Sequence, residues 1–446
     1  MSNIGIYTAL SGLQAQTIGL QTVAQNIANA TTPGYTTEQA NISTLPTIGP
    51  NGAGGGAYVT GINRMSDPMG QNSYLATQSS AQQANTTQAT LASIENIFPE
   101  PSSTGIQSQL SSFWSSWDNV ANNPSMTAPR IQVISNAQNL ATSLNQSSAA
   151  LTNLQNSLSS QVQTSVPQIN GYLSQVASLN QSIVSQLAQG STPNSLMDQR
   201  NVILDKLSQQ LGTTITHSKS GTINIYVGGI TLVQGNIADS LSLQGSAGSM
   251  SLVSAHTSTA IPITSGSIAA MLTGINTTIP SFQSQLNQVA SSLITTVNNQ
   301  QAAGINASGT AGPAIFTGNN ASNIEVNQSV VANPSLLDAA APGTGSNNGA
   351  NAQAMAELSN STSANSPDKL YQSFIASLGT QAQTANNNAT DQSALVSSVT
   401  ASYKASTGVD SNTQMMQMVA YQRAYQSAAK LLANLSSNFQ ALLQAV

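Results

Sequence analysis

Four charged side chains form the densest charge cluster in the chain: Asp198, Arg200, Asp205 and Lys206. A carboxylate beside a guanidinium could take part in acid–base chemistry. The simpler interpretation is an acid at the start of a helix, favoured by the helix dipole, with Arg200 tying that helix to an adjoining element. The cluster therefore predicts a structural role, and no catalytic residue is assigned.

Three other patterns could hold a metal, a nucleotide or a nucleophile. His217 and His256 have no Cys or carboxylate at ligand spacing. No strand precedes the glycine-rich run 52–57 and an extended segment follows it, which predicts a flexible loop and not a dinucleotide site. Ser366 begins a Ser-x-x-Lys pattern without companion motifs, and before Pro367 it is better explained as a helix N-cap. We expect no enzyme, no cofactor and no metal.

Charged residues make up only 5% of the 446 residues, against roughly 25% in a typical soluble domain. The nine basic residues are scattered and outnumbered by fourteen acidic ones, so no nucleic-acid partner is expected. Salt screens Coulomb attraction but does not weaken apolar burial in the same way. The composition therefore favours a polar, nearly uncharged surface whose contacts persist in variable media.

Two features of the sequence bear on location. No apolar run reaches the roughly 18 residues of a membrane span, so no membrane contact is expected. Residues 1–63 contain no Lys or Arg and a single acid, Glu38, so the basic start of a secretory signal peptide is missing. A secreted protein of this kind would leave the cell without cleavage of its N-terminus.

The first 28 or so residues predict one amphipathic helix. Its apolar positions recur at steps of four and three, the pattern of a coiled-coil seam, and include Ile6, Leu10, Leu13, Leu20 and Ile27. The helix is expected to stop at residues 29–34. There Pro33 disfavours helix for the residue before it, and Gly34 permits the positive φ of a turn.

The last helix has the strongest periodic signal in the chain. Its seam runs to the last residue and includes Met418, Tyr421, Tyr425, Leu432, Leu435, Phe439, Leu442 and Val446. Ser411 and Gln414 have the spacing of a capping box, in which a hydroxyl and an amide satisfy each other's free backbone donors. A helix from about residue 411 to the last residue is therefore expected.

The middle of the chain predicts further helices. Apolar positions from 151 to 187 indicate a long helical region, with Pro167 as a kink or break. Additional helices are expected over about 276–300 and 367–404.

Residues 213–263 change to a period of two and turn at Gly228-Gly229, which predicts a β-meander. The whole pattern predicts a mainly α fold with an inserted β domain, elongated and multidomain, whose N- and C-terminal helices pair as a coiled coil. The expected domains are a terminal coiled-coil domain (1–35 with 408–446), a helical middle domain (36–205 with 266–407) and a β-rich outer domain (206–265), which parts of 303–345 could join.

A seam at each end of the chain favours self-assembly. A pair of helices buries only one stripe per helix, so ordering the terminal segments needs further apolar contacts, and copies of the same chain are the natural source. The alternative is that each seam packs within its own chain or in a dimer. Charges beside a seam usually set pairwise partner choice, and their near absence here favours a lattice.

Four segments carry a family resemblance. ALSGLQAQTIGLQTVAQNIANATTPGYT (9–36) and VDSNTQMMQMVAYQRAYQSAAKLLANL (409–435) are similar to the terminal signatures of flagellar rod, hook and hook-associated proteins. PNSLMDQRNVILDKLSQQLG (193–212) and INIYVGGITLVQG (223–235) resemble the hook-associated protein FlgK family. The motif residues include Asn26, Asn29, Pro33, Gly34, Tyr35, Asp198, Gln199 and Arg200.

The resemblance implies a structural subunit of the bacterial flagellum, outside the cell at the junction between hook and filament. It implies as partners copies of the chain in a helical ring, the hook protein, the second junction protein FlgL and an export chaperone at the C-terminal helix. It also implies export in unfolded form through the flagellar type III apparatus and terminal helices that line a channel. The chain departs from the pattern at Thr37, where an Arg is common, and in being shorter than many relatives after about residue 310, where an outer β domain is missing.

Two alternatives remain open. One is another axial subunit, from the hook or the distal rod, with the same ends and a different middle. The segment 193–212 and the long helices expected from 107 to 188 argue against it. The other is a secreted coiled-coil type III translocator, which would usually contain a membrane-active apolar stretch.

Overall fold

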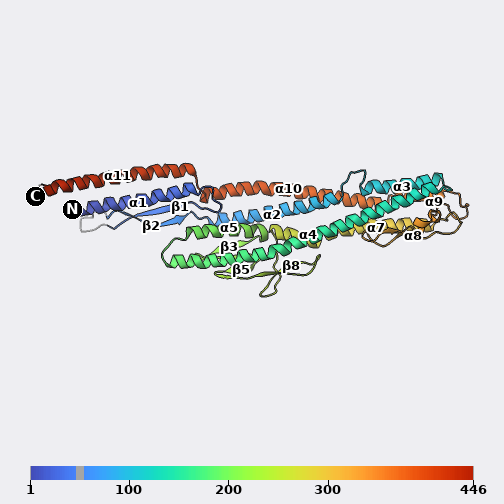
Figure 1. The fold of residues 1–446 in the computed structure, drawn as a ribbon, viewed down its shortest axis with the longest axis horizontal. Coiled ribbons are helices and arrows are strands. Elements are labelled where there is room, and N and C mark those ends of the chain that lie inside the picture. The colour runs from blue at the N-terminus through green and yellow to red at the C-terminus, as the bar shows by residue number, and fades with distance from the viewer. Residues whose placement is uncertain (1, 47–54, 445–446) are drawn as a thin grey trace.

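The computed structural model describes residues 2–46 and 55–444. The molecule is elongated, and α1 (Ser2–Ala28) and α11 (Ser411–Gln444) lie side by side at one end, which we call the terminal end (Figure 1). From there α2 (Pro68–Ile97) leads into the body of the molecule, and α10 (Pro367–Thr407) returns beside it. The predicted out-and-back, mainly helical chain with paired terminal helices is confirmed.

A two-stranded hairpin packs on α1. Its strands, β1 (Glu38–Thr44) and β2 (Ala57–Arg64), are antiparallel. The backbone N–H of Ala57 donates a hydrogen bond of 3.1 Å to the hydroxyl of Ser11, which ties β2 to α1. The sequence indicated only that an extended segment follows the glycine-rich run. The hairpin was not predicted, because the apolar alternation in β1 is short, with Ala40 and Ile42 alone. Residues 52–54 of the predicted glycine-rich loop lie outside the described residues.

Helices of varied length make up most of the body of the molecule. Besides α2 and α10 these are α3 (Ile106–Asn122), α4 (Thr127–Ala188), α5 (Asn194–Leu211), α6 (Gly266–Thr273), the π-helical turn η1 (Gly274–Thr278) and α7 (Ile279–Ala302). α4 continues for 62 residues, and Pro167 does not break it. Pro167 is exposed, so water can bond the carbonyl that loses its helical donor.

The hydrophobic core runs along the body helices. Phe374 of α10 packs against Phe98 and Phe282, with ring centroids 4.7 and 5.8 Å apart and the rings nearly perpendicular. The buried indole of Trp114 donates a hydrogen bond of 2.9 Å to the carboxylate of Asp368. Because these rings come from α3, α7, α10 and the end of α2, they join the outgoing and returning parts of the chain.

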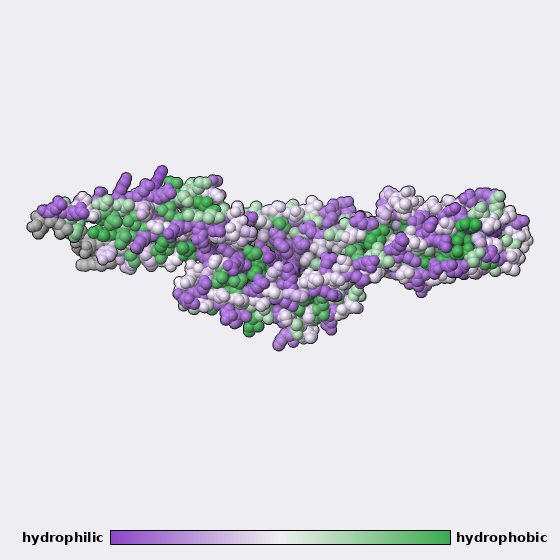
Figure 2. Space-filling model, in the orientation of Figure 1, coloured by the Kyte–Doolittle hydropathy of each residue, from purple (hydrophilic) through white to green (hydrophobic). Residues whose placement is uncertain are grey.

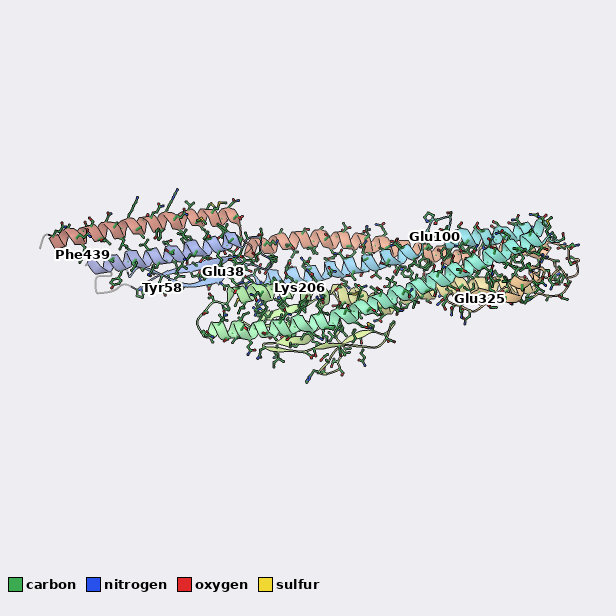
Figure 3. All side chains as sticks on the ribbon, in the orientation of Figure 1. Glu38, Tyr58, Glu100, Lys206, Glu325 and Phe439 are labelled. Carbon is green, nitrogen blue, oxygen red and sulfur yellow. The ribbon has the colours of Figure 1, made fainter. Side chains whose placement is uncertain are left out.

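The predicted β-meander is confirmed. β3 (Thr214–His217), β4 (Ile223–Val227), β5 (Ile230–Gln234) and β6 (Ile237–Ala238) form one antiparallel sheet in chain order, and β7 (Leu241–Gln244) pairs with β8 (Ser251–Ser254). Gly228 and Gly229 have φ angles of 54° and 82°, as the tight turn between β4 and β5 requires. The strands lie against α4 and bulge from one side of the body (Figures 1 and 3).

Short strands and helices cover the end of the molecule that lies far from the termini. They are β9 (Phe316–Thr317), β10 (Glu325–Val326), α8 (Gln328–Ala332), η2 (Pro334–Leu336), α9 (Ala350–Glu357) and η3 (Leu358–Asn360). Buried Arg130 donates to the carbonyl of Leu337 and, at 2.9 Å, to that of Pro124. Residues 303–345, which the sequence analysis allowed to join the β domain, thus pack on α4 and α7.

Two predicted helix caps differ in detail. Asp410 caps α11, because its carboxylate accepts a hydrogen bond of 2.6 Å from the N–H of Thr413. The predicted capping box of Ser411 and Gln414 is therefore wrong. Ser366 does occupy the N-cap position of α10, but its buried hydroxyl has no hydrogen-bond partner among the described residues.

Candidate assembly interface

The two terminal helices meet along one line of small residues. Gly5, Gly12, Gly19 and Asn26 of α1 lie against Leu435, Ala428, Tyr421 and Gln414 of α11, respectively. Both series step by seven residues in opposite directions, so the pair is antiparallel and has one register. A Cβ atom on Gly19 would lie 2.7 Å from the ring of Tyr421. The glycines therefore allow a close approach that larger residues would prevent.

Asn26 connects the parts of the terminal end. Its buried amide donates to the carbonyl of Glu38 at 2.8 Å and to the Gln414 side chain at 2.9 Å. Its oxygen accepts from the Tyr35 hydroxyl at 2.8 Å and from the Glu38 N–H at 2.9 Å. Burial, together with the charges of Glu38 and Asp198, raises the pKa of Tyr35, so the hydroxyl remains a donor. One side chain thus joins α1, α11, β1 and the turn after α1.

The apolar stripe predicted on α1 does not face α11. Leu13, Leu20 and Ile27 each follow a contact-line residue by one position, which places them about 100° around the helix. Ser11, on the other side of that line, bonds the hairpin. The stripe therefore lies on the side of α1 away from the hairpin, where Leu10 is 42% exposed.

The predicted positions on α11 fall into two groups. Tyr421 and Leu435 lie on the contact line with α1. Four others remain partly or largely accessible: Met418 and Leu432, which are half-buried, and Tyr425 and Phe439, which are 41% and 42% exposed. Leu442 belongs to α11, and Val446 lies outside the described residues.

Part of the accessible apolar surface of the two helices, on the side of the α1 stripe, forms what we call the terminal face. In an antiparallel pair, corresponding sides of the two helices face the same way. The terminal face comprises Ile6, Leu10, Leu13, Leu20 and Ile27 of α1 with Met418, Tyr425 and Leu432 of α11. Hydrophobic side chains gather over the terminal helices in Figure 2. Residues 1–37 and 411–446 carry only two charges, Arg423 and Lys430, so this end is apolar and weakly cationic.

The turn after α1 packs on α5 and joins the terminal end to the body. Gly34 has a φ of 77°, and a Cβ there would lie 2.5 Å from the Val202 side chain. Arg64, at the end of β2, forms an ion pair of 2.6 Å with Asp198 and donates to Thr36 at 2.7 Å. Burial raises the pKa of Asp198 to about 6, against the opposing pull of Arg64.

The remaining motif residues have structural positions. Arg200 donates from Nη1 to Asn180 at 2.7 Å and to the carbonyl of Gly221 at 2.9 Å, and so ties α5 to α4 and to the β3–β4 turn, as expected. Asp198 is not a helix-start acid, since α5 begins at Asn194. Asn29 lies in the turn after α1, where its carbonyl accepts from the N–H of Thr32. Pro33 and Gln199 are exposed.

A cavity of about 630 Å³ lies where the terminal end meets the body. It is lined by the turn after α1, by α2 and α5, and by the end of α10. Tyr74 and Tyr403 stack there with ring centroids 5.2 Å apart. The Tyr74 hydroxyl lies 3.5 Å from the carboxylate of Asp205, and burial raises the pKa of Asp205 to about 6. This region thus contains two half-buried carboxyl groups, Asp198 and Asp205, whose pKa values are raised by burial.

The described residues contain no group of three or more His, Asp or Glu that could hold a metal ion. None of the helices in the described ranges is long and apolar enough to cross a membrane. The terminal end instead presents accessible apolar residues on α1 and α11. Hydrogen bonds of Asn26 and Arg64 hold this end together and attach it to the body.

Several contact residues escaped the sequence analysis. The glycine series of α1 was visible as a spacing of seven between Gly5, Gly12 and Gly19, but a search for apolar side chains passes over glycine. Gln414 was assigned to a cap. Arg64 had no signal, because its partner Asp198 is 134 residues away.

The fold is that of an elongated helical protein with its two chain ends paired at one extremity. Family models of flagellar proteins match most of it: residues 91–316 match the helical domain of flagellar hook-associated protein FlgK, 6–36 match the flagella basal body rod protein, and 402–445 match the C-terminal part of the basal body rod proteins FlgEFG. The first match covers just over half of the chain. The chain therefore belongs to the flagellar hook-associated protein FlgK family.

Relatives named flagellar hook-associated protein 1 include that of Bacillus subtilis, 33% identical over 49% of this chain and 45% of the relative, and that of Escherichia coli, 30% identical over 70% and 59%. The solved structure of the hook junction protein FlgK from Burkholderia pseudomallei has a TM-score of 0.66, with 18% identity over 75% of this chain and 99% of that one, and supports the fold. The chain spans about half the length of the curated relatives it matches.

Replacing Gly19 by Ala tests the close approach of α1 and α11. The added Cβ would lie 2.7 Å from the Tyr421 ring, so the helix pair should lose about 1–3 kcal/mol. Amide hydrogen exchange in α1 and α11 should accelerate accordingly. The control is Gly171→Ala in α4, where a Cβ meets nothing within 4 Å and should stabilise the helix by about 0.5–1 kcal/mol. Unchanged exchange in the Gly19 variant would contradict the proposed packing.

Asp205→Asn tests the cost of the buried carboxylate. A carboxyl whose pKa is raised in the folded state binds more protons there than when unfolded, so Asp205 lowers stability as pH rises from about 4 to about 6. The urea midpoint of the variant should exceed that of the parent at pH 7, and the two should converge near pH 4. Burial lowers the pKa of His217, so the contribution of this residue to stability increases as pH rises. This contribution is the same in the parent and in the variant. Exposed Asp391→Asn is the control and should leave the pH profile unchanged.

Proposed function

We propose that this chain is a structural subunit of the bacterial flagellum, outside the cell, which forms the junction between hook and filament and does no chemistry. Its copies associate in a helical ring through their terminal helices. Membership of the FlgK family and the rod-protein matches at both ends support this function.

The observation that carries the proposal is the terminal face. A lone chain leaves Leu10 and Tyr425 of this face about 40% exposed at an end that has almost no charge. Contiguous exposed apolar surface on a soluble protein commonly marks an interaction site. A second copy supplies the same uncharged surface, so apolar burial can drive association with little dependence on salt.

The proposed partners follow from the same position in the flagellum. They are further copies of the chain, the hook protein, the second junction protein FlgL and an export chaperone at the C-terminal helix. Export is proposed to use the flagellar type III apparatus without a cleaved signal peptide. The domain division proposed is the terminal pair (1–35 with 408–446), the helical body (36–205 with 266–407) and the β region (206–265).

Deleting the gene and restoring it tests this function. Cells without the protein should form hooks, release filament subunits into the medium and fail to swim, and the intact gene should restore filaments. Absent or defective hooks in the deletion strain would instead favour a hook or rod subunit.

A pair of variants tests the terminal face itself. Leu10→Ser should weaken addition of purified protein to isolated hooks at least tenfold, because losing about 1.5 kcal/mol of apolar burial per contact corresponds to a factor of about ten. The control is Leu187→Ser at the end of α4, matched in type and in exposure, with 38% against 42% for Leu10. Equal addition of both variants to hooks would remove the terminal face from the interface.

A further inference from the structure

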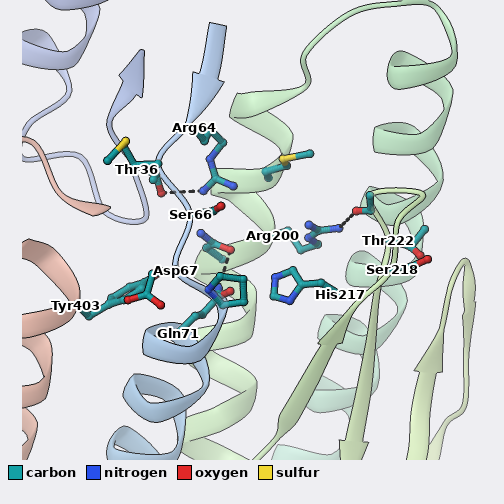
Figure 4. A pocket seen from close by; sticks show the side chains of 15 residues that line it. Thr36, Arg64, Ser66, Asp67, Gln71, Arg200, His217, Ser218, Thr222 and Tyr403 are labelled. Carbon is teal, nitrogen blue, oxygen red and sulfur yellow. Dashed lines mark hydrogen bonds between the residues drawn. The ribbon is translucent and has the colours of Figure 1, made fainter. Parts of the chain in front are cut away.

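A small cavity where the terminal end meets the body is lined by two arginines. Its volume is about 140 Å³, and its walls come from the β2–α2 link, α5, the β3–β4 turn and the end of α10 (Figure 4). Arg64, Arg200 and His217 line it together with the hydroxyl residues Ser66 and Ser218. This volume holds roughly four oxygen-sized groups, since a water takes about 30 Å³.

The guanidinium of Arg200 has no carboxylate partner. It is 5% exposed, and both of its hydrogen bonds within the described residues come from Nη1 and go to neutral oxygens, those of Asn180 and Gly221. Its buried Nε–H has no acceptor in that part of the chain. Burial lowers the pKa of Arg200 to about 10, and the positive charge of Arg64 adds to the shift. A buried cation beside another cation is costly unless an anion compensates it.

The acids near the cavity are already engaged. Asp198 pairs with Arg64 at 2.6 Å. Asp67, which lines the cavity, caps α2 by accepting from the N–H of Gly70 and also accepts from the hydroxyl of Ser406 at 3.1 Å. Burial also lowers the pKa of Arg130, the buried arginine away from this site, but there the charge of Asp338 opposes the shift. Among the described residues Arg200 forms no ion pair, and the charge that acts on it is that of another cation, Arg64.

We propose that this cavity binds a small tetrahedral oxyanion, sulfate or phosphate, between the guanidinium groups of Arg200 and Arg64. The planar forks of two arginines suit the oxygens of such an anion. The bound anion would connect β2, α5 and the β3–β4 turn, and so stiffen the base of the terminal helices. The proposal does not depend on the assembly function.

The two histidines of the sequence, His217 and His256, report on occupancy. Burial and the charges of Arg200 and Arg64 lower the pKa of His217, and Asp67 and Tyr403 also line its cavity. An anion at the site should raise the pKa of His217, whereas exposed His256, which does not line the cavity, serves as the control imidazole. The measurement is an NMR titration of both imidazoles in sodium sulfate, sodium phosphate and sodium chloride at equal ionic strength.

A saturable shift of His217 alone, in sulfate or phosphate but not in chloride, is the expected result. Comparing the half-saturation concentrations of the two salts shows which oxyanion the cavity prefers. Equal behaviour in all three salts, or equal shifts of His217 and His256, would overturn the proposal.

Arg200→Met removes the guanidinium, and sulfate should then bind at least tenfold more weakly, judged by the half-saturation concentration of the His217 shift. Exposed Arg423→Met is the matched control and should bind as the parent does. If Arg200→Met does not fold, the salt comparison on the unmodified chain decides alone. Unchanged sulfate binding by a folded Arg200 variant would also reject the site.

Discussion

The close approach of α1 and α11 is the constraint on which the terminal end depends. Three glycines, spaced by seven residues, remove side chains from one line of α1, and α11 fills the space with Tyr421, Ala428 and Leu435. As a consequence, the larger apolar residues of α1 lie on a side of the helix that does not face α11. Small residues of α1 therefore set the register of the pair. Bulky apolar side chains such as that of Leu10 remain accessible to other molecules.

The base of this pair is held by polar groups whose partners are distant in sequence. Asn26 uses both ends of its amide to join α1, α11 and β1, and Arg64 reaches Asp198 on α5. Buried polar groups of this kind are costly when unpaired, so they favour one arrangement over its alternatives. The terminal pair is thereby attached to the body in one orientation.

Much of the fold follows from periodicity that the sequence displays directly. The terminal helices, α4, α10 and the β-meander were all predicted, because each buries a regular stripe or alternating face. The hairpin was not, since the apolar alternation in β1 is short, and neither was the glycine line, since its signal is an absence of side chains. The apolar stripe of α1 was found but its partner was misjudged: periodicity shows that Leu13 and Leu20 share a face and does not show what the face contacts.

The scarcity of charge gives the few buried ionic groups unusual weight. Asp198, Asp205, Asp338 and Asp368 are each buried enough for their pKa values to be raised, so their protonation favours the folded state. In most proteins, falling pH instead neutralises carboxylates that ion pairs hold ionised, and stability is lost. Here one ion pair, Arg64 with Asp198, occurs among the described residues, and apolar packing carries the rest. A surface with few charges keeps contacts insensitive to salt, whereas the carboxyl groups with raised pKa values make the fold more stable in mild acid than at neutral pH.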